Sequence, residues 1–336
     1  MAYNVKEVVA NKPSIFNAGH RMCAGCGAPV VGRMVMRALK EGDHAVVSNA
    51  TGCMEVSTCI YPYSSWDCSY IHTAFECASA TCSGVEAAYK AMKRTGKLNE
   101  NETFKFITFG GDGGTYDIGL QSLSGAMERG HDMTYVCYDN GAYMNTGIQR
   151  SSATPHFADT TTSPAGEKIP GKMQIRKDLT EVMEAHHLPY VAQTAAIMNF
   201  KDLYEKAEKA IYTEGPTFLN VLAPCPRGWG YPTDMLMEMS KLAVDTCYWP
   251  LYEVVDGKYK ITYKSFKEEL INLVGIGDNT PDLLLYSTTL KTILENVIIE
   301  SRETGDEISV NELLLSLLNE GEGKAIRILL SLGVDI

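Results

Sequence analysis

A glycine-rich turn, followed later in the chain by a second turn of similar character, constrains this sequence more than any other feature. The first turn, Phe109-Gly110-Gly111-Asp112-Gly113-Gly114-Thr115, comes after a short aromatic and β-branched run at 104–109 and before a helix-like segment at 116–128. This order predicts a strand, a turn and a helix. Because glycine has no side chain, backbone N–H groups at such a turn can approach an anion closely.

The second turn follows a similar run at 133–138 and continues from Asp139 to Gly147. Asp112 in the first turn and Asn140 in the second are hard oxygen ligands of the kind that Mg²⁺ takes together with phosphate oxygens and water. One glycine-rich turn is common in α/β proteins, but two such turns joined by a strand-helix-strand unit favour a diphosphate cofactor. The dinucleotide fingerprint Gly-x-Gly-x-x-Gly is absent, which argues against a nicotinamide or flavin dinucleotide.

Helical and strand patterns alternate along the first 220 or so residues. The expected helices are 30–39, 74–93, 178–187 and 200–212, and the further expected strands are 45–48, 190–193 and 217–222. This alternation predicts an α/β fold with a doubly wound parallel sheet and ligands at the carboxyl ends of its strands. We expect residues 1–19 to form a surface arm, residues 54–75 to be irregular, and residues 147–172 to form a long polar loop over the cofactor.

The charge and hydrophobicity of the chain limit the classes of partner that it can bind. The 336 residues carry a formal net charge of -11, which argues against nucleic acid and an anionic membrane surface as main partners. No stretch reaches the ~20 apolar residues of a membrane span, and no secretion signal is present, so we expect a cytoplasmic protein. Ten cysteines in that setting are expected to be reduced thiols and metal ligands rather than disulfides.

The Cys-x-x-Cys pair at Cys23 and Cys26 allows three interpretations: a zinc knuckle, a redox pair, or half of a cluster site. A zinc ribbon needs a second close pair, and none has the right spacing. Four thiolates gathered from separated loops would suit a [4Fe–4S] cluster. Two histidines, His20 and His72, border these segments, and the sequence does not settle their roles. Six cysteines are assigned no role: Cys59, Cys68, Cys77, Cys82, Cys137 and Cys247.

The two turns together resemble the thiamine-diphosphate and magnesium motif of the 2-oxoacid:ferredoxin oxidoreductase family, in the β subunit of its pyruvate-specific members. The resemblance covers about 1–262 and implies a sheet of the thiamine-diphosphate-binding type. It implies that Asp112, Asn140 and the carbonyl of Ala142 bind Mg²⁺, and that Asn145 lies near the reacting carbon. The other implied cofactor contacts are Gly52, Cys53, Gly111, Gly113, Gly114 and Thr146, and the implied [4Fe–4S] ligands are Cys23, Cys26, Cys53 and Cys225.

The family's activity, as implied by the resemblance, is oxidative decarboxylation of pyruvate with coenzyme A to acetyl-CoA and CO₂. Electrons would pass through the cluster to ferredoxin. The implied partners are an α subunit, with γ and δ subunits or fused equivalents, and the carboxylate that activates the cofactor is expected on a partner. The alternatives are a related oxidoreductase of oxalate or branched-chain 2-oxoacids, a thiamine-dependent decarboxylase or synthase without a cluster, and a helical adaptor protein.

The adaptor alternative comes from residues 263–336, where composition changes and we expect a separate α-helical segment. Amphipathic patterns occur at 263–275, 290–302, 310–318 and 325–332. Residues 310–335 resemble part of the helical repeat of the Clp ATPase N-terminal domain, a docking module. A natural fusion, a chimera and an error in the sequence all remain open as reasons for this join.

Overall fold

An eight-stranded sheet forms the centre of the computed structural model, which describes residues 3–12, 14–99, 101–196 and 200–263. Apart from residues 245–250, these belong to one compact unit, 1–244 with 251–263. The strands are β1 (His44–Ala50), β2 (Ser69–Thr73), β3 (Phe104–Gly111), β4 (Thr134–Asp139), β5 (Tyr190–Ala195), β6 (Thr217–Leu222), β7 (Tyr252–Val255) and β8 (Lys258–Ile261). Their order is β2-β1-β3-β4-β6-β5-β7-β8, with β1 to β6 parallel and the β7–β8 hairpin antiparallel at one edge.

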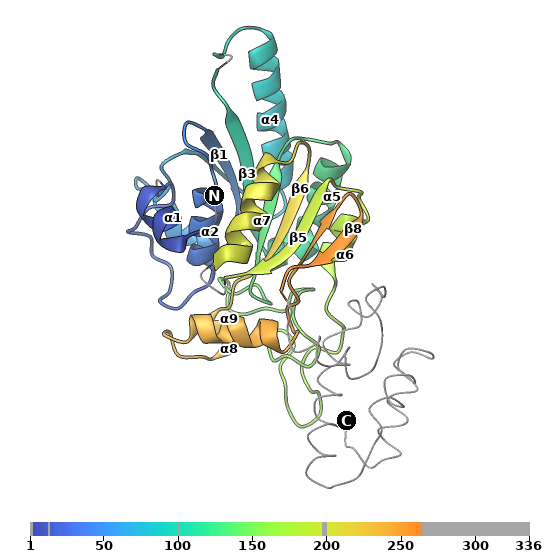
Figure 1. The fold of residues 1–336 in the computed structure, drawn as a ribbon. Coiled ribbons are helices and arrows are strands. Elements are labelled where there is room, and N and C mark those ends of the chain that lie inside the picture. The colour runs from blue at the N-terminus through green and yellow to red at the C-terminus, as the bar shows by residue number, and fades with distance from the viewer. Residues whose placement is uncertain (1–2, 13, 100, 197–199, 264–336) are drawn as a thin grey trace. The chain divides into compact units, whose positions relative to one another are not determined.

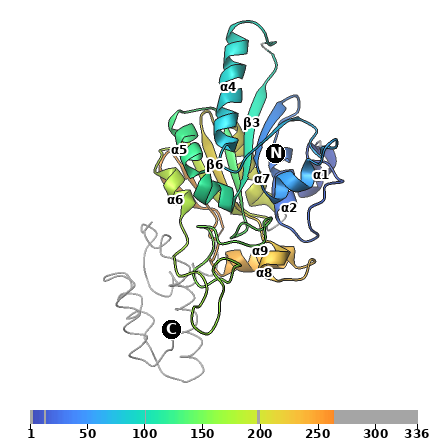
Figure 2. The same cartoon turned by 180° about the vertical axis from the view of Figure 1, so that it is seen from behind.

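Helices cover both faces of this sheet (Figures 1 and 2). On one face lie α1 (Val5–Asn11), α2 (Ala28–Arg37) and α7 (Lys201–Tyr212), and on the other α4 (Ala78–Arg94), α5 (Leu120–Glu128) and α6 (Leu179–Glu184). Each layer has its own apolar core against the sheet. The other α-helices in the described residues are α3 (Cys53–Thr58), α8 (Pro226–Trp229) and α9 (Leu236–Asp245).

The burial of the central strands explains why this sequence forms a parallel sheet that is covered on both faces. Every residue of β4, β5 and β6 is buried, as expected for parallel strands that are covered on both faces. The predicted α/β fold with a doubly wound parallel sheet is therefore confirmed. Among the helices of the described ranges, none is both long and apolar enough to cross a bilayer.

Two sequence-based expectations were wrong. Residues 54–75 are not irregular, since they contain α3 and the parallel edge strand β2. The β2 sequence Ser-Tyr-Ile-His-Thr is polar and only partly buried, because an edge strand does not need the apolar run that marks a central one. Residues 1–19 are more than a surface arm, because Phe16 is fully buried and stacks on Trp66 with ring centroids 4.6 Å apart.

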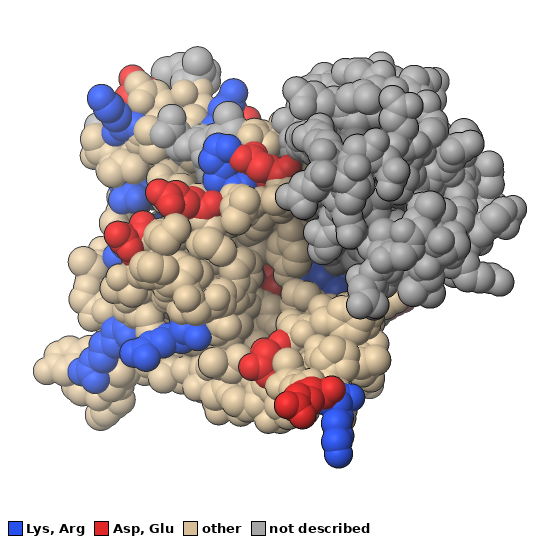
Figure 3. All heavy atoms as spheres, turned by 90° about the horizontal axis from the view of Figure 1, so that it is seen from below, with Lys and Arg blue, Asp and Glu red and all other residues tan. Residues whose placement is uncertain are grey.

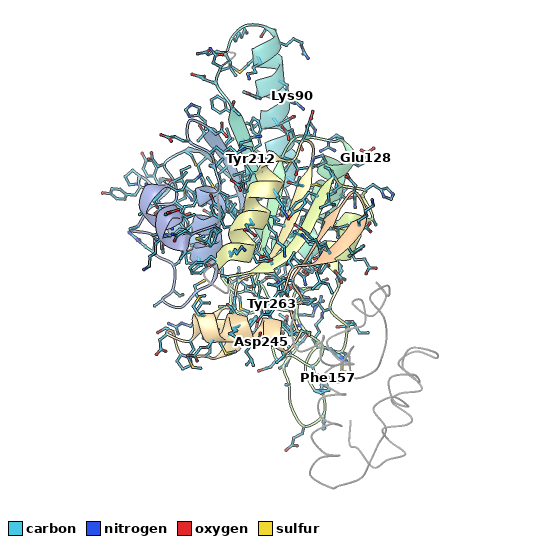
Figure 4. The ribbon with its side chains drawn as sticks, viewed as in Figure 1. Lys90, Glu128, Phe157, Tyr212, Asp245 and Tyr263 are labelled. Carbon is cyan, nitrogen blue, oxygen red and sulfur yellow. The ribbon has the colours of Figure 1, made fainter. Side chains whose placement is uncertain are left out.

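The carboxyl ends of β1, β3, β4 and β6 meet at one edge of the sheet. β1 pairs with β2 on one side and β3 on the other, so the chain reverses its winding direction there, and such a switch point opens a crevice at the strand ends. The loop at 147–172 lies at this edge, with Phe157 at the opposite end of the unit from Lys90 of α4 (Figure 4). Where described residues show on the face seen from below, uncharged side chains predominate and charged ones form small groups (Figure 3). The helices expected within 264–336 lie outside the described residues.

Candidate functional site

A pocket opens at the ends of β1, β3 and β4, and all ten residues implied as cofactor contacts line it: Gly52, Cys53, Gly111, Asp112, Gly113, Gly114, Asn140, Ala142, Asn145 and Thr146. Five further residues line it that sequence reasoning did not identify: Thr51, Phe75, Tyr138, Tyr143 and Met144. Four of these adjoin the glycine-rich turns, so proximity in sequence was a usable signal. Phe75 was not recognisable, because it lies at the end of the stretch expected to be irregular.

Asp112 and Asn140 meet because their strands are neighbours. Gly111 pairs with Tyr138 across β3 and β4, so the chain leaves both strands at the same height. The Asn140 amide N–H donates to Asp112 Oδ1 at 3.3 Å, and the Ser151 hydroxyl donates to Asp112 Oδ2. Burial raises the pKa of Asp112 well above its usual value, and the neighbouring Asp139 raises it further. A carboxylate here therefore requires a compensating positive charge.

The Asn140 side chain completes a set of three oxygens. With its amide oxygen turned inward, Oδ1 lies 2.8 Å from Asp112 Oδ1 and 2.8 Å from the Ala142 carbonyl, whereas the reverse orientation lets Nδ2 donate to both. Adjacent corners of an Mg²⁺ octahedron are about 2.9 Å apart, given metal–oxygen distances of 2.0–2.1 Å. The first orientation is compatible with a hard cation beside these oxygens, and hydrogen bonding within the protein alone favours the second. We call these three atoms the oxygen site.

The glycines of the first turn bring protein groups together as well as leaving room for a ligand. A Cβ on Gly113 would lie 2.4 Å from the Tyr143 ring, and the Tyr143 hydroxyl donates to the Gly113 carbonyl at 2.7 Å. The turn continues as a π-helix, Gly113–Ile118, before α5 begins. Such π-turns are frequent at functional sites. Sequence reasoning had assigned those glycines to anion approach alone.

Two basic side chains hold the loop at 147–172, and one of them joins it to the end of β4. Arg176 forms an ion pair with Asp139, at 2.6 Å, and donates to the Ala153 carbonyl at 2.8 Å. Lys172, which is 1% exposed, donates to the Thr154 carbonyl at 2.5 Å. Burial lowers the pKa of Lys172 to about 8. The segment next to the pocket is thus fixed by contacts that the polar composition of the loop did not reveal.

Four cysteines lie near one another beside the pocket, and we call Cys23, Cys26, Cys53 and Cys225 the thiol site. Cys26 and Cys225 are 9% and 8% exposed, Cys53 is half-buried at the start of α3, and Cys23 is exposed. The Gly27 amide donates to the Pro224 carbonyl at 3.0 Å, which joins the Cys-x-x-Cys segment to the Cys225 loop.

The thiols of this site are close enough to interact electrostatically. Burial raises the pKa of Cys26 and of Cys53 to about 12. The thiols of Cys225 and Cys23 contribute to both increases, and that of Cys26 contributes to the increase at Cys53. Among the described residues, no three His, Cys, Asp or Glu side chains are grouped as ligands of a single metal ion. A [4Fe–4S] cluster is bulkier, and each thiolate binds a different iron, so a wider set of four sulfurs suits it better than it suits one zinc ion.

The two sites share parts. Cys53 lines the pocket and belongs to the thiol site. Trp229 of α8, four residues after Cys225, donates its indole N–H to the Asn140 carbonyl at 2.7 Å. Met144 of the pocket packs against the same helix, because a Cβ on Gly228 would lie 2.2 Å from Met144 Sδ.

Neither histidine left open by the sequence lines this pocket. The His20 ring packs against Phe16, and its Nε2 lies within hydrogen-bond distance of Arg33 Nη2, at 2.9 Å. His72 lies behind the pocket wall, 2.9 Å from the Thr51 hydroxyl. All ten cysteines are free thiols.

Residues 50–221 match the family model described as the thiamine pyrophosphate enzyme, C-terminal TPP binding domain. The chain is 53% identical over 268 residues to pyruvate synthase subunit PorB of Thermotoga maritima, which covers 79% of this chain and 82% of the relative. It is 54% identical over 254 residues to PorB of Methanocaldococcus jannaschii, covering 76% and 84%. Ketoisovalerate oxidoreductase subunit VorB of Pyrococcus furiosus is 45% identical over 254 residues, covering 76% and 80%.

Among solved structures, 2-oxoglutarate:ferredoxin oxidoreductase from Magnetococcus marinus, with 2-oxoglutarate, coenzyme A and succinyl-CoA bound, superposes with a TM-score of 0.54. The match has 19% sequence identity and covers 83% of this chain and 94% of that chain, so it supports the fold. None of these matches supports the resemblance of residues 310–335 to a Clp repeat.

Proposed function

Because this chain belongs to the family of pyruvate synthase PorB subunits, we propose that it is the catalytic subunit of a pyruvate:ferredoxin oxidoreductase, with thiamine diphosphate, Mg²⁺ and a [4Fe–4S] cluster bound at one sheet edge. The observation that carries the proposal is that one pocket is lined both by the three residues of the oxygen site and by Cys53 of the thiol site.

Thiamine diphosphate, when bound, supplies a carbanion and an electron sink for decarboxylation of a 2-oxoacid. On this chain, Asp112, Asn140 and the Ala142 carbonyl would hold Mg²⁺, and the backbone at Gly113 and Gly114 would approach the diphosphate. Asn145 and Thr146, at the pocket wall, would contact the reacting end of the cofactor. The buried surroundings of Asp112 strengthen each of these electrostatic contacts, because they exclude water.

The four thiols would hold the cluster, which supplies a one-electron acceptor next to the pocket. This chain's contribution is to position the cysteines: Cys53 begins α3 just after β1, Cys225 follows β6, and the Gly27–Pro224 hydrogen bond joins the Cys-x-x-Cys segment to the Cys225 loop. Ferredoxin would be the final acceptor.

A partner subunit would complete the active site. Among the described residues that line the pocket, Asp112 is the only carboxylate, and the oxygen site already uses it. The carboxylate that activates the cofactor would therefore come from an α subunit, with γ and δ subunits or fused equivalents carrying electrons onward. We assign cofactor binding to residues 1–262, treat 263–336 as a separate helical segment, and place the complex in the cytoplasm.

The test is co-expression with candidate partner subunits, followed by anaerobic purification. We expect brown protein in which about four iron and four sulfide per copy of this chain add to those that the partner subunits hold, and dye reduction that requires both pyruvate and coenzyme A. Colourless protein that contains zinc would overturn the cluster assignment. Decarboxylation without a cluster would favour a thiamine-dependent decarboxylase or synthase.

A second substrate class deserves a parallel assay, because a ketoisovalerate oxidoreductase subunit is 45% identical to this chain. Comparing kcat/KM for pyruvate, 2-oxoisovalerate and oxalate in the same complex separates these possibilities. A higher value for 2-oxoisovalerate would replace pyruvate as the proposed substrate and leave the cofactor assignments intact.

A further inference from the structure

The hydroxyl group of Tyr138 is a buried polar group without a function in the proposal above. Tyr138 lies on β4, is 1% exposed and lines the pocket. Its oxygen has no hydrogen-bond partner among the described residues. The nearby Met54 amide favours negative charge on this oxygen without reaching hydrogen-bond geometry, so it does not use the hydroxyl proton. A buried hydroxyl that donates to nothing is costly, which points to an acceptor that binds later.

The position of this hydroxyl limits what the acceptor can be. A Cβ on Gly52 would lie 2.5 Å from the Tyr138 oxygen, so the hydroxyl lies directly against the residue that precedes Cys53. Burial raises the pKa of Tyr138 well above its usual value, and Cys53 is the next largest cause. A phenol keeps its proton at physiological pH, because its ordinary pKa is about 10, so this hydroxyl can act as a donor.

Another sulfur of the thiol site already has a donor. The Gly228 amide donates to Cys225 Sγ at 3.4 Å. No such contact from a described residue to Cys53 is seen, although Cys53 is the sulfur closest to the cofactor pocket. The Tyr138 hydroxyl is the group placed to supply it.

We propose that the Tyr138 hydroxyl donates a hydrogen bond to Cys53 Sγ when that sulfur is a thiolate ligand of the [4Fe–4S] cluster, and that it thereby raises the reduction potential of the cluster. This inference rests on the proposed function, because it requires the cluster. Reduction adds negative charge to the cluster and its sulfurs, so a donor at one sulfur stabilises the reduced form. Tyr138 acts through Cys53 and is a positioning residue.

The test is Tyr138→Phe in the complete complex, with the midpoint potential followed by electron paramagnetic resonance during a redox titration. We expect a lower potential. A tenfold smaller ratio of reduced to oxidised cluster at a fixed potential corresponds to about 59 mV for a one-electron couple. The matched control is Tyr135→Phe, on the same strand, whose buried hydroxyl lies on the other face of the sheet 3.1 Å from Thr115. This control should leave the potential unchanged.

A second variant keeps the side chain and so preserves folding. Incorporating 3-fluorotyrosine at position 138 makes the phenol a stronger donor and should raise the potential. An unchanged potential in both variants, with iron content retained, would overturn the inference. So would weaker thiamine diphosphate binding at an unchanged potential, because the hydroxyl would then serve the cofactor. Absence of a cluster in the unmodified complex would instead refute the proposed function.

Discussion

The oxygen site and the thiol site adjoin one pocket but are built in different ways. Asp112 and Asn140 are 28 residues apart and end two neighbouring strands that one strand-helix-strand unit joins. The thiol site takes its residues from the segment before α2, from the end of β1 and from the end of β6. Cys23 and Cys225 therefore come close only when the strands between them have paired. One site is local and the other depends on long-range pairing.

The largest expected effect separates the two sites. Cys225→Ser should remove the cluster, so that iron falls by about four per copy of this chain and dye reduction is lost. Thiamine diphosphate and Mg²⁺ binding, measured by calorimetry, should persist, because the oxygen site does not use Cys225. Cys77→Ser is the matched control and should keep its iron. Loss of both cofactors in Cys225→Ser would show that the sites are not independent.

Substitutions at the oxygen site should give the converse result. Asp112→Asn keeps the shape of the side chain but removes its charge, and Mg²⁺ affinity should fall by at least about 100-fold. Ser151→Ala removes the hydrogen-bond donor to Asp112, and Mg²⁺ affinity should fall by about 10- to 100-fold. Iron content should be unchanged in both variants. Calorimetric titration with Mg²⁺ and thiamine diphosphate measures the effect, and an Asp112→Asn protein with undiminished affinity would contradict the assignment.

Trp229 offers a way to measure how strongly the sites are coupled. Trp229→Phe keeps most of the packing and removes the hydrogen bond to the Asn140 carbonyl. A single hydrogen bond is worth about 1 kcal/mol, so Mg²⁺ affinity should fall about fivefold while the cluster is retained. If the effect of Trp229→Phe on Mg²⁺ affinity is the same with and without Cys225→Ser, the indole acts locally. If it disappears in the double variant, the indole carries the coupling.

The smallest effect is expected at Glu253, which lies at the sheet edge outside both sites. Burial alone would raise its pKa, but hydrogen bonds from Lys209 and Lys260 lower it to about 2, from an ordinary value of 4.5. A carboxyl group with a lowered pKa stabilises the fold fully above pH 4.5 and loses that contribution as pH falls towards 2.

Glu253→Gln should therefore reduce the free energy of unfolding at pH 7 by about 1 kcal/mol, since both lysines are largely exposed and water screens them. The difference from the unmodified protein should shrink as pH falls from 4.5 towards 2. Denaturant titrations across this range measure it. Cofactor content at pH 7 should not change, and a pH-independent difference would argue against an electrostatic cause.

The same contrast explains what could be predicted from the sequence. The parallel sheet and the pairing of Asp112 with Asn140 follow from apolar runs and glycine-rich turns, because adjacent parallel strands end together. The four cysteines were selected by resemblance to a family, since nothing in their spacing distinguishes Cys53 or Cys225 from Cys59 or Cys137. Only the folded chain shows that these four thiols lie near one another.

The contacts around the pocket were beyond prediction for a related reason. Tyr143 fills the space beside Gly113, and Lys172 and Arg176 anchor the long loop through backbone carbonyls and Asp139. Such contacts depend on three-dimensional proximity and leave no periodic pattern. β2 was missed because a polar edge strand resembles a loop in composition.

The strand order also implies a sequence of events during folding. β6 follows β5 in the chain but lies between β4 and β5 in the sheet. β4 therefore meets its partner β6 only after β5 has been synthesised, and pairings of such high sequence separation form slowly. Because Cys225 directly follows that strand, the fourth thiol arrives when the sheet closes. A nascent chain that has not yet released Cys225 from the ribosome can offer at most three of the four thiols, so a group that binds all four can be inserted only after that point in synthesis.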